Sequence, residues 1–439
     1  MKITIVGAGY VGLVSGACFA EFGHHVTCVD KSDEKIAALL NGQIPIYEPG
    51  LDAIVSDNAK AGRLTFTTEL GPAVADAEIV FIAVGTPSRR GDGHADLSYV
   101  YQASEEIAGS LKDFTVVATK STVPVGTGDE VERIIRQANP EANFAVASNP
   151  EFLREGAAID DFKRPDRIVV GIEDERARGP MTEVYRPLYL NKGPLVFTSR
   201  RTAELIKYAS NSFLAMKITF INEMADLAEA VGANVQDVAR TIGLDKRIGS
   251  KFLHSGPGFG GSCFPKDTTA LVKTADDFGQ TLNLVETTIN VNTRRKRAMA
   301  KKVIAALEGD VRGKRICLLG LTFKPNTDDM RDAPSIAIAQ ALKDAGATIT
   351  AYDPQGMAQA KLEMDYIQYH ENAYAAAADA DAVCIVTEWN QFRALDLARL
   401  KREMNTPILV DLRNIYRRDE VEPHGFKYRC VGRPDQEVG

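Results

Sequence analysis

A chain of 439 residues is longer than a single hydrophobic core usually grows, so the sequence predicts two or three domains. Its composition, 45% hydrophobic and 25% charged, is that of a folded soluble protein and leaves little room for long disordered stretches. The formal net charge of −7 argues against a general affinity for nucleic acid, although a local basic pocket for a small anion is compatible with it.

The first 150 residues alternate β-branched runs with helical patterns. The strand candidates are KITIV (2–6), HHVTCVD (24–30), AEIVFIAVGTP (77–87), FTVVATKSTVP (114–124) and FAVASNPE (144–151). This alternation predicts a parallel sheet covered by helices. The apolar run 3–20 is interrupted by glycines after its β-branched start, which is typical of a strand, a turn and a helix. We therefore expect neither an export signal nor a membrane role.

The middle of the chain is predicted to be helical. Residues 202–231 show helical apolar spacing without internal Gly or Pro, and Gly232 follows them. A helix of about 30 residues spans about 45 Å, which is enough to link two domains and to offer a surface for pairing subunits. A further helical region is expected over 265–307.

After this helical region the strand pattern resumes with KRICLLG (314–320), ATITAYDP (347–354), DAVCIVTEW (381–389) and TPILVDLRN (406–414). Both ends of the chain run from a strand through a glycine turn and a helix to a strand ending in an acid, Asp30 or Asp353. This internal repetition predicts an α/β protein with two doubly wound, Rossmann-like domains, 1–200 and 306–439, joined by the long helix and a central helical region, 201–305.

A dinucleotide site is predicted at Gly7-Ala8-Gly9-Tyr10-Val11-Gly12, which follows a strand, opens a helix and precedes Asp30 by about 20 residues. The glycines permit the turn, the approach of the pyrophosphate and close helix packing. Asp30 would bind the ribose hydroxyls and repel a 2′-phosphate, which favours NAD over NADP, although Lys31 and Lys35 weaken that preference. The second repeat, from Gly320 to Pro325, keeps only the first glycine and is not expected to bind a dinucleotide.

Six cysteines without a C-x-x-C pair or clustered histidines indicate neither disulfides nor a metal site, and they favour a cytoplasmic location. Cys263 is unusual, because a glycine-rich run precedes it and Pro265 predicts the first turn of a helix beside it. The helix dipole and Lys266 would favour the thiolate, and Asp267 lies one turn further on. The other cysteines are expected to be small core residues or, for Cys430, part of the tail. A buried, inert Cys263 is the alternative.

Two further pairs are candidates for acid–base chemistry. Lys207 and Asn211 stand at i and i+4 on the predicted long helix, within a largely apolar stretch. Glu151 and Glu155 follow a strand end, where sites gather in such sheets. Solvated surface charges remain the alternative for both pairs, and also for Lys324 and Arg331 in the loop after Gly320.

Six motifs in order, GAGYVG, STVPVGT, SNPEFLREG, ELIKYASNSFLAMKI, PGFGGSCFPKD and GLTFKPNTDDMRDAPS, resemble those of the UDP-glucose/GDP-mannose dehydrogenases over nearly the whole chain. The resemblance implies a four-electron oxidation at C6 of a nucleotide sugar with NAD, through a thioester on Cys263. It also implies at least a dimer.

The resemblance further implies roles by motif position. Cys263 would be the nucleophile, Lys207 and Asp267 would handle the proton and oxyanion, Glu151 would be the base for hydrolysis, and Asn211 and Thr122 would position water or the oxyanion. The cofactor would contact Gly7, Gly9, Tyr10, Val11, Gly12, Asp30, Lys35, Thr86, Thr122, Glu155 and Arg331. The sugar nucleotide would contact Glu151, Phe152, Leu153, Lys207, Asn211, Phe259, Gly260, Phe323, Lys324 and Arg413, with Arg247 reaching a neighbouring subunit's site.

The resemblance orders the substrates, because relatives that act on N-acetylhexosamines tend to replace the Lys of C-F-P-K-D. UDP-glucose is therefore expected before GDP-mannose and UDP-N-acetylhexosamines. Two alternatives stay open. A 3-hydroxyacid dehydrogenase would explain the glycine loop and Lys207 but not an activated Cys263. A non-catalytic NAD-binding scaffold would need neither a nucleophile nor its partners.

Overall fold

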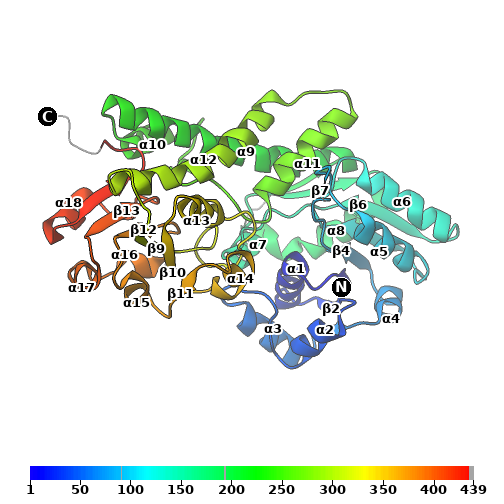
Figure 1. The fold of residues 1–439 in the computed structure, drawn as a ribbon. Coiled ribbons are helices and arrows are strands. Elements are labelled where there is room, and N and C mark those ends of the chain that lie inside the picture. Colours follow the sequence, from blue (N-terminus) through cyan, green and yellow to red (C-terminus); the bar gives the residue numbers. More distant parts are fainter. Residues whose placement is uncertain (90, 192–193, 435–439) are drawn as a thin grey trace. The chain divides into compact units, whose positions relative to one another are not determined.

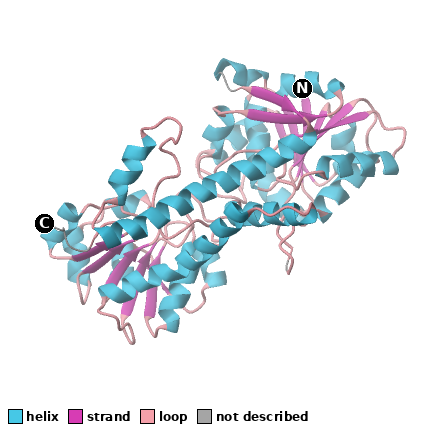
Figure 2. Ribbon diagram, turned by 90° about the horizontal axis from the view of Figure 1, so that it is seen from above, coloured by secondary structure: helices cyan, strands magenta, loops and turns pink. Residues whose placement is uncertain are grey.

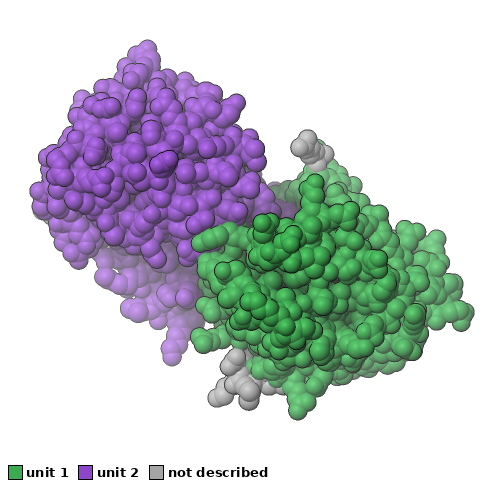
Figure 3. Space-filling view, turned by 90° about the horizontal axis from the view of Figure 1, so that it is seen from below, with its two compact units in different colours: residues 1–210, 269–280 green, residues 211–268, 281–439 purple. Residues whose placement is uncertain are grey.

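The computed structural model describes residues 1–89, 91–191 and 194–434. The chain divides into two compact units, one formed by 1–210 and 269–280 and the other by 211–268 and 281–439 (Figure 3). Two helices, α9 (Arg200–Val231) and α11 (Phe264–Asp277), contribute residues to both units. The three-part division at 200 and 305 stays a prediction.

The first unit contains a sheet in the order β3-β2-β1-β4-β5-β6-β7-β8, with helices around it (Figure 1). All its strand pairs are parallel except β6 with β7. Its strands are β1 (Lys2–Val6), β2 (His25–Val29), β3 (Leu64–Thr67), β4 (Ile79–Ile82), β5 (Thr115–Thr119), β6 (Phe144–Ser148), β7 (Ile168–Ile172) and β8 (Leu195–Thr198). Its helices are α1 (Tyr10–Glu21), α2 (Asp33–Leu40), α3 (Leu51–Lys60), α4 (Leu70–Ala75), α5 (Ser98–Ala108), α6 (Thr127–Ala138), α7 (Ala158–Lys163) and α8 (Arg178–Val184), with short 3-10 turns η1 (Glu175–Ala177) and η2 (Arg186–Asn191).

Both faces of this sheet are buried. On β4, Ile79 and Phe81 belong to the core shared with α1 and α3, whereas Val80 and Ile82 belong to the core shared with α5 and α6. Successive side chains of a strand point to opposite faces, so a strand buried on both sides is a continuous apolar run. The sequence IVFI of β4 therefore follows from its central place in a doubly wound sheet.

The second unit repeats the plan with the order β11-β10-β9-β12-β13-β14, all parallel. Figure 2 shows each group of strands, in magenta, among its helices. The strands are β9 (Arg315–Leu319), β10 (Thr348–Tyr352), β11 (Gln368–Tyr369), β12 (Ala382–Ile385), β13 (Ile408–Asp411) and β14 (Lys427–Cys430). The helices are α10 (Val235–Gly243), α12 (Asn283–Ala306), α13 (Pro334–Asp344), α14 (Met357–Glu363), α15 (Ala373–Ala377), α16 (Asn390–Arg393), α17 (Leu397–Glu403) and α18 (Arg418–Val421), with a 3-10 turn η3 (Glu422–His424).

The first six strands of one sheet and the six of the other thus have the same 3-2-1-4-5-6 order, which confirms the predicted fold class. The long helix is also confirmed, with 32 residues in α9. Cys430 lies on β14 and is buried, so its placement in a tail was wrong. Short strands such as β3, β7, β8, β11 and β14 were not predicted.

Candidate active site

The glycine loop after β1 has the geometry of a phosphate site. Gly7 has φ +105°, in the left-handed region, and a Cβ at Gly12 would lie 1.8 Å from the Gly7 carbonyl oxygen. At Gly9 a Cβ would meet no atom within 4 Å, and α1 begins at Tyr10 without a side-chain cap. Open space in front of uncapped N–H groups at a helix start fits the pyrophosphate of a dinucleotide.

Asp30 follows β2 and faces the same loop. Its Oδ2 accepts hydrogen bonds from Ala8 N at 2.9 Å and from Lys35 Nζ at 2.8 Å. Burial raises the pKa of Asp30, but the Lys35 ammonium and the N–H groups of Ser32 and Ala8 outweigh it and hold the pKa below its ordinary value. Lys31 instead binds Glu106 at 2.6 Å. Asp30 is therefore an ionised acceptor in a position suited to a ribose.

Two other residues assigned to the cofactor meet at the ends of neighbouring strands. The Thr86 hydroxyl donates to the Thr122 carbonyl oxygen at 2.9 Å.

Tyr10 donates to Glu48, whose carboxylate also accepts from the backbone N–H groups of Gly156 and Ala158 at 2.6 and 2.8 Å. Glu48 thus ties the glycine loop to the turn that carries Glu155. Burial, followed by Glu48, raises the pKa of Tyr10.

Glu151 and Lys207 form a buried ion pair in the first unit. Lys207 Nζ donates to Glu151 Oε1 at 3.0 Å, and the side chains are 3% and 6% exposed. The second carboxylate oxygen accepts from Leu153 N, and Phe152 lies under the Lys207 ammonium with its ring centroid 5.4 Å away. The structure therefore brings together four of the residues assigned to the substrate. A paired carboxylate and ammonium away from bulk water can exchange or hold a proton.

In the second unit Cys263 immediately precedes α11, and Asp267 N donates to the Cys263 carbonyl oxygen at 2.8 Å. Asn211 Nδ2 and Lys266 Nζ each lie 2.6 Å from an oxygen of the buried Asp267 carboxylate. The charge of Lys266 is thus partly balanced by Asp267. Cys263 is partly exposed, and the other five cysteines are buried free thiols. A reactive role suits Cys263 best on this criterion.

The glycine run before Cys263 packs closely against the loop that follows β9. A Cβ at Gly260 would lie 2.3 Å from the Asp332 carbonyl oxygen, and one at Gly261 would lie 2.7 Å from the Phe323 ring. Arg413 donates to the Phe323 carbonyl oxygen at 3.0 Å and pairs with Glu388. The structure therefore brings Gly260, Phe323 and Arg413 together, and their contacts with the sugar nucleotide stay a prediction. Phe259 is held by two hydrogen bonds to Asn292.

Three assigned cations of the second unit have local partners. Arg331 makes hydrogen bonds to both oxygens of Asp329, and Lys324 lies over the Phe323 ring at 5.1 Å. Arg247 pairs with Asp245 in a surface loop, and its side chain is 89% exposed. Their proposed contacts with cofactor, substrate or a second subunit remain predictions.

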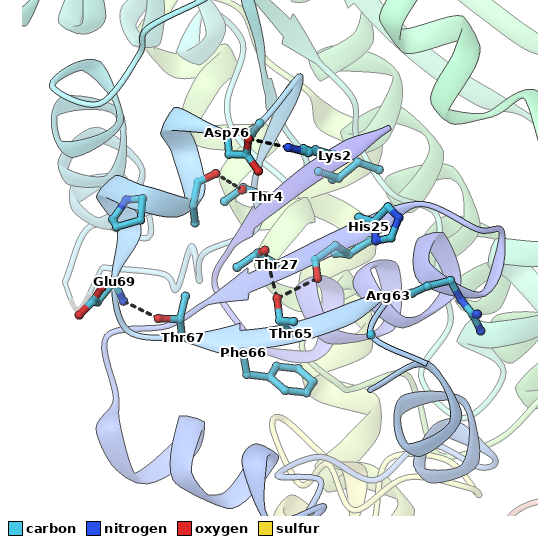
Figure 4. Close-up of a pocket in the computed structure, with 16 residues that line it drawn as sticks. Lys2, Thr4, His25, Thr27, Arg63, Thr65, Phe66, Thr67, Glu69 and Asp76 are labelled. Carbon is cyan, nitrogen blue, oxygen red and sulfur yellow. Dashed lines mark hydrogen bonds and ion pairs between the residues drawn. The ribbon is translucent and has the colours of Figure 1, made fainter. Parts of the chain in front are cut away.

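A hollow of about 490 Å³ in the first unit is lined by none of these residues. It lies over β1, β2 and β3, where the hydroxyls of Thr27 and Thr65 are 3.1 Å apart and Lys2 pairs with Asp76 (Figure 4). Ligands of doubly wound sheets bind beyond the carboxyl ends of the strands, whereas Lys2 and His25 begin theirs. Some of its polar side chains bind one another, and none of the assigned site residues lines it.

Sequence reasoning missed several residues that support the site. Lys120, Asn149 and Tyr185 form a buried cluster beside Glu151 and Lys207, and Asp329 accepts from Ser262 N at 3.2 Å. A lysine ending the apolar run FTVVATK was the available signal for Lys120. Among the described residues, no group of metal-ligating side chains is found and no helix has the length and apolarity to cross a bilayer.

Comparisons with known proteins agree with this arrangement. Three models of the UDP-glucose/GDP-mannose dehydrogenase family match in order: the NAD binding domain at residues 1–189, the central domain at 201–294 and the UDP binding domain at 317–418. A UDP-glucose 6-dehydrogenase of Rhizobium meliloti (strain 1021) is 70% identical over 437 residues, covering 99% of this chain and 100% of that protein. The chain belongs to the UDP-glucose/GDP-mannose dehydrogenase family.

Solved structures of this family give the same result. A UDP-glucose dehydrogenase from Pyrobaculum islandicum superposes with a TM-score of 0.90 at 38% identity, covering 98% of this chain and 97% of that one. A UDP-D-ManNAc dehydrogenase from Pyrococcus horikoshii has a TM-score of 0.87 at 27% identity, covering 99% of this chain and 100% of that one. The chain is therefore an NAD-dependent dehydrogenase of this family. The two alternatives, a 3-hydroxyacid dehydrogenase and a non-catalytic scaffold, are not needed to explain its motifs.

Proposed function

We propose that the chain oxidises UDP-glucose to UDP-glucuronate with two NAD, through a thioester on Cys263. The observation that carries the proposal is the one partly exposed cysteine, placed at the start of α11 beside the Asn211–Asp267–Lys266 cluster. The 70% identity to a UDP-glucose 6-dehydrogenase supports the choice of substrate. The family resemblance implies that Lys266 in C-F-P-K-D favours UDP-glucose over N-acetylhexosamine nucleotides.

The first unit would hold the cofactor. Gly7, Gly9 and Gly12 would bind the pyrophosphate, Asp30 the adenosine ribose, and Thr86 and Thr122 the nicotinamide end. NAD, when bound, supplies the acceptor for the hydride in each of the two oxidations. Lys35 keeps one oxygen of Asp30 engaged, so the preference for NAD over NADP is expected to be moderate.

Residues of the chain itself would transfer the protons and form the covalent bond to C6 of the sugar. As C6 loses its hydride, Asp267 would take the hydroxyl proton, and the Lys207 ammonium would stabilise the charge on the oxygen. The Cys263 thiolate then adds to the aldehyde carbon, forming the C–S bond of a thiohemiacetal. Loss of a second hydride and of the hydroxyl proton leaves the thioester.

Hydrolysis would release the acid. Glu151 takes a proton from a water molecule, the water oxygen forms a bond to the thioester carbon, and the C–S bond breaks with Cys263 leaving as the thiolate. Asn211 and Thr122 would position the water or the oxyanion. Lys324 and Arg413 would bind the nucleotide, since both are cations on the loops after strands of the second sheet.

The assembly is proposed to be at least a dimer paired through α9. Phe213, Phe220 and Leu227 are spaced seven residues apart along α9 and are 59%, 47% and 53% exposed. Heptad spacing places them on one face, and large exposed apolar side chains along a helix are typical of a packing surface for a second helix. The exposed Arg247 would reach the second subunit's site. All six cysteines are free thiols, which supports a cytoplasmic location.

The test is the amount of NADH formed per sugar nucleotide consumed, followed at 340 nm with UDP-glucose, GDP-mannose and UDP-N-acetylglucosamine supplied separately. Two NADH per UDP-glucose, with little from the others, is the expected result. One NADH per substrate would contradict the thioester route, and oxidation of another sugar nucleotide in preference would contradict the substrate.

A further inference from the structure

Lys120 is a buried lysine next to the predicted catalytic pair. It follows β5, directly before Ser121 and Thr122, and is 4% exposed. Its ammonium lies 5.8 to 5.9 Å from the ring centroids of Phe81, Phe162 and Tyr185. It therefore occupies an aromatic pocket in which water contributes little to its solvation.

The polar contacts of Lys120 lead to Glu151. Nζ donates to Asn149 Oδ1 at 3.3 Å and to Tyr185 Oη at 3.2 Å, and the Tyr185 hydroxyl donates to the same Asn149 oxygen. Asn149 Nδ2 donates to the Val169 carbonyl oxygen at 2.8 Å. Asn149 stands two residues before Glu151, so this network holds the segment that carries the proposed base.

The charge of Lys120 acts on the same site. Burial lowers the pKa of Lys120 from 10.5 to about 8, while attraction to Glu151 opposes this shift and repulsion by Lys207 adds to it. Those two groups and the Tyr185 phenol are the titratable groups that face it. Below pH 8 Lys120 therefore adds a positive charge that attracts Glu151, in addition to Lys207, which contacts Glu151 directly.

Stability does not explain a lysine at this position. Placing an ammonium in an apolar pocket costs several kcal/mol, and apolar side chains of similar volume in such places are often neutral or stabilising. We propose that Lys120 is a positioning residue for Glu151, which holds the Asn149–Glu151 segment in place for hydrolysis of the thioester. This inference rests on the proposed role of Glu151.

The experiment compares Lys120→Met and Glu151→Gln in the full-length protein, mixed with UDP-glucose and NAD. We expect both variants to form two NADH per subunit in a burst and then to turn over about 10 to 100 times more slowly than the wild type. Mass spectrometry of the acid-quenched protein should show a sugar-nucleotide adduct on Cys263. Lys163→Met, which removes a surface partner of Glu21, is the control and should turn over normally.

The two variants distinguish the role inferred for Lys120 from the role proposed for Glu151. If Glu151→Gln accumulates the adduct while Lys120→Met turns over normally and shows no adduct, the inference about Lys120 is overturned and the proposed function stays intact. Normal release of acid by Glu151→Gln would overturn the role of Glu151 itself. Loss of the burst in folded Lys120→Met would also overturn the inference, because Lys120 would then act before the thioester forms.

Stability measurements test whether the role of Lys120 is merely structural. Because the folded pKa of Lys120 lies below the unfolded one, the unfolded chain binds more protons between pH 8 and 10.5, and this residue makes the free energy of unfolding rise with pH in that window. Lys120→Met should lack the rise and be as stable as the wild type at pH 7.5. If that variant does not fold, Tyr185→Phe, which removes one partner of Lys120, should slow acid release about two- to fivefold; unchanged release would refute the proposal.

Discussion

The two sheets share one strand order but differ at the residue that ends their second strand. Asp30 accepts from three donors, Ala8 N, Ser32 N and Lys35 Nζ, which leaves acceptor capacity for a ligand. Asp353 is fully buried and accepts from six donors: Leu321 N, Thr322 N, Thr322 Oγ1, Gln355 N, Gly356 N and Trp389 Nε1. The acid at this position keeps acceptor capacity in the first sheet, whereas it closes the loop in the second.

The loops that follow the first strand, β1 or β9, also differ between the two sheets. In the first sheet α1 begins three residues after Gly7 and leaves space at Gly9. In the second sheet the connection after β9 is longer, and α13 begins only at Pro334. Topology therefore places a ligand site at a sheet edge, but the first turn and its donors decide what the site can hold.

The largest expected effect separates cofactor binding from chemistry. Cys263→Ser should reduce release of UDP-glucuronate by about 10³-fold or more, because a serine hydroxyl at neutral pH is a far weaker nucleophile than a thiolate. NAD binding, measured by calorimetry, should not change, since the glycine loop and Asp30 belong to the first unit. Cys384→Ala, in the buried strand β12, is the control that should keep activity. Normal production of UDP-glucuronate by Cys263→Ser would contradict the thioester mechanism.

A side chain at Gly9 should block the first sheet's site without harming the fold. The residue has ordinary φ and free space around it, so Gly9→Val should change the free energy of unfolding by no more than about 1 kcal/mol. NAD affinity should fall by about 100-fold, because the side chain occupies the place of the pyrophosphate. Gly179→Ala, at another open surface position, is the matched control. Unchanged affinity in Gly9→Val would show that the dinucleotide binds elsewhere.

Removing the acid of the second sheet should affect stability alone. Asp353→Ala leaves buried donors without an acceptor and should lower the free energy of unfolding by about 2 to 4 kcal/mol, measured by urea denaturation. NAD affinity of the folded variant should match the wild type. A marked loss of NAD affinity would mean that the second sheet takes part in cofactor binding, which would break the comparison.

The corresponding change in the first sheet should act mainly on binding. Asp30→Ala should weaken NAD binding by about tenfold and improve NADP relative to NAD, because it removes two ribose hydrogen bonds and a repulsive charge. The pKa of Asp30 is lowered in the folded protein, so its stabilising contribution is complete above the unfolded value of 3.8 and disappears as pH falls through the folded pKa. NAD affinity should therefore not depend on Asp30 titration between pH 5 and 8. An Asp30-dependent change within that range would contradict the assignment.

Local sequence patterns were sufficient for much of the molecule. Central strands such as β4 and β12 are short apolar runs because both faces are buried, and α9 shows uninterrupted helical spacing, so local periodicity predicts them. The glycine loop and the start of α11 after Cys263 were predicted for a similar reason, because glycine and proline restrict the backbone within a few residues.

The short outer strands and the support of the site depended on tertiary structure. β3 and β14 are four-residue strands of mixed polarity, LTFT and KYRC, which become strands only because a neighbour provides backbone partners. Lys120, Asn149 and Tyr185 come from three separate segments and meet only when β5, β6 and the turn after α8 are in place. Spacing along a chain predicts neighbours within one turn or strand, whereas burial and charge at Glu151 are set by residues far away in sequence.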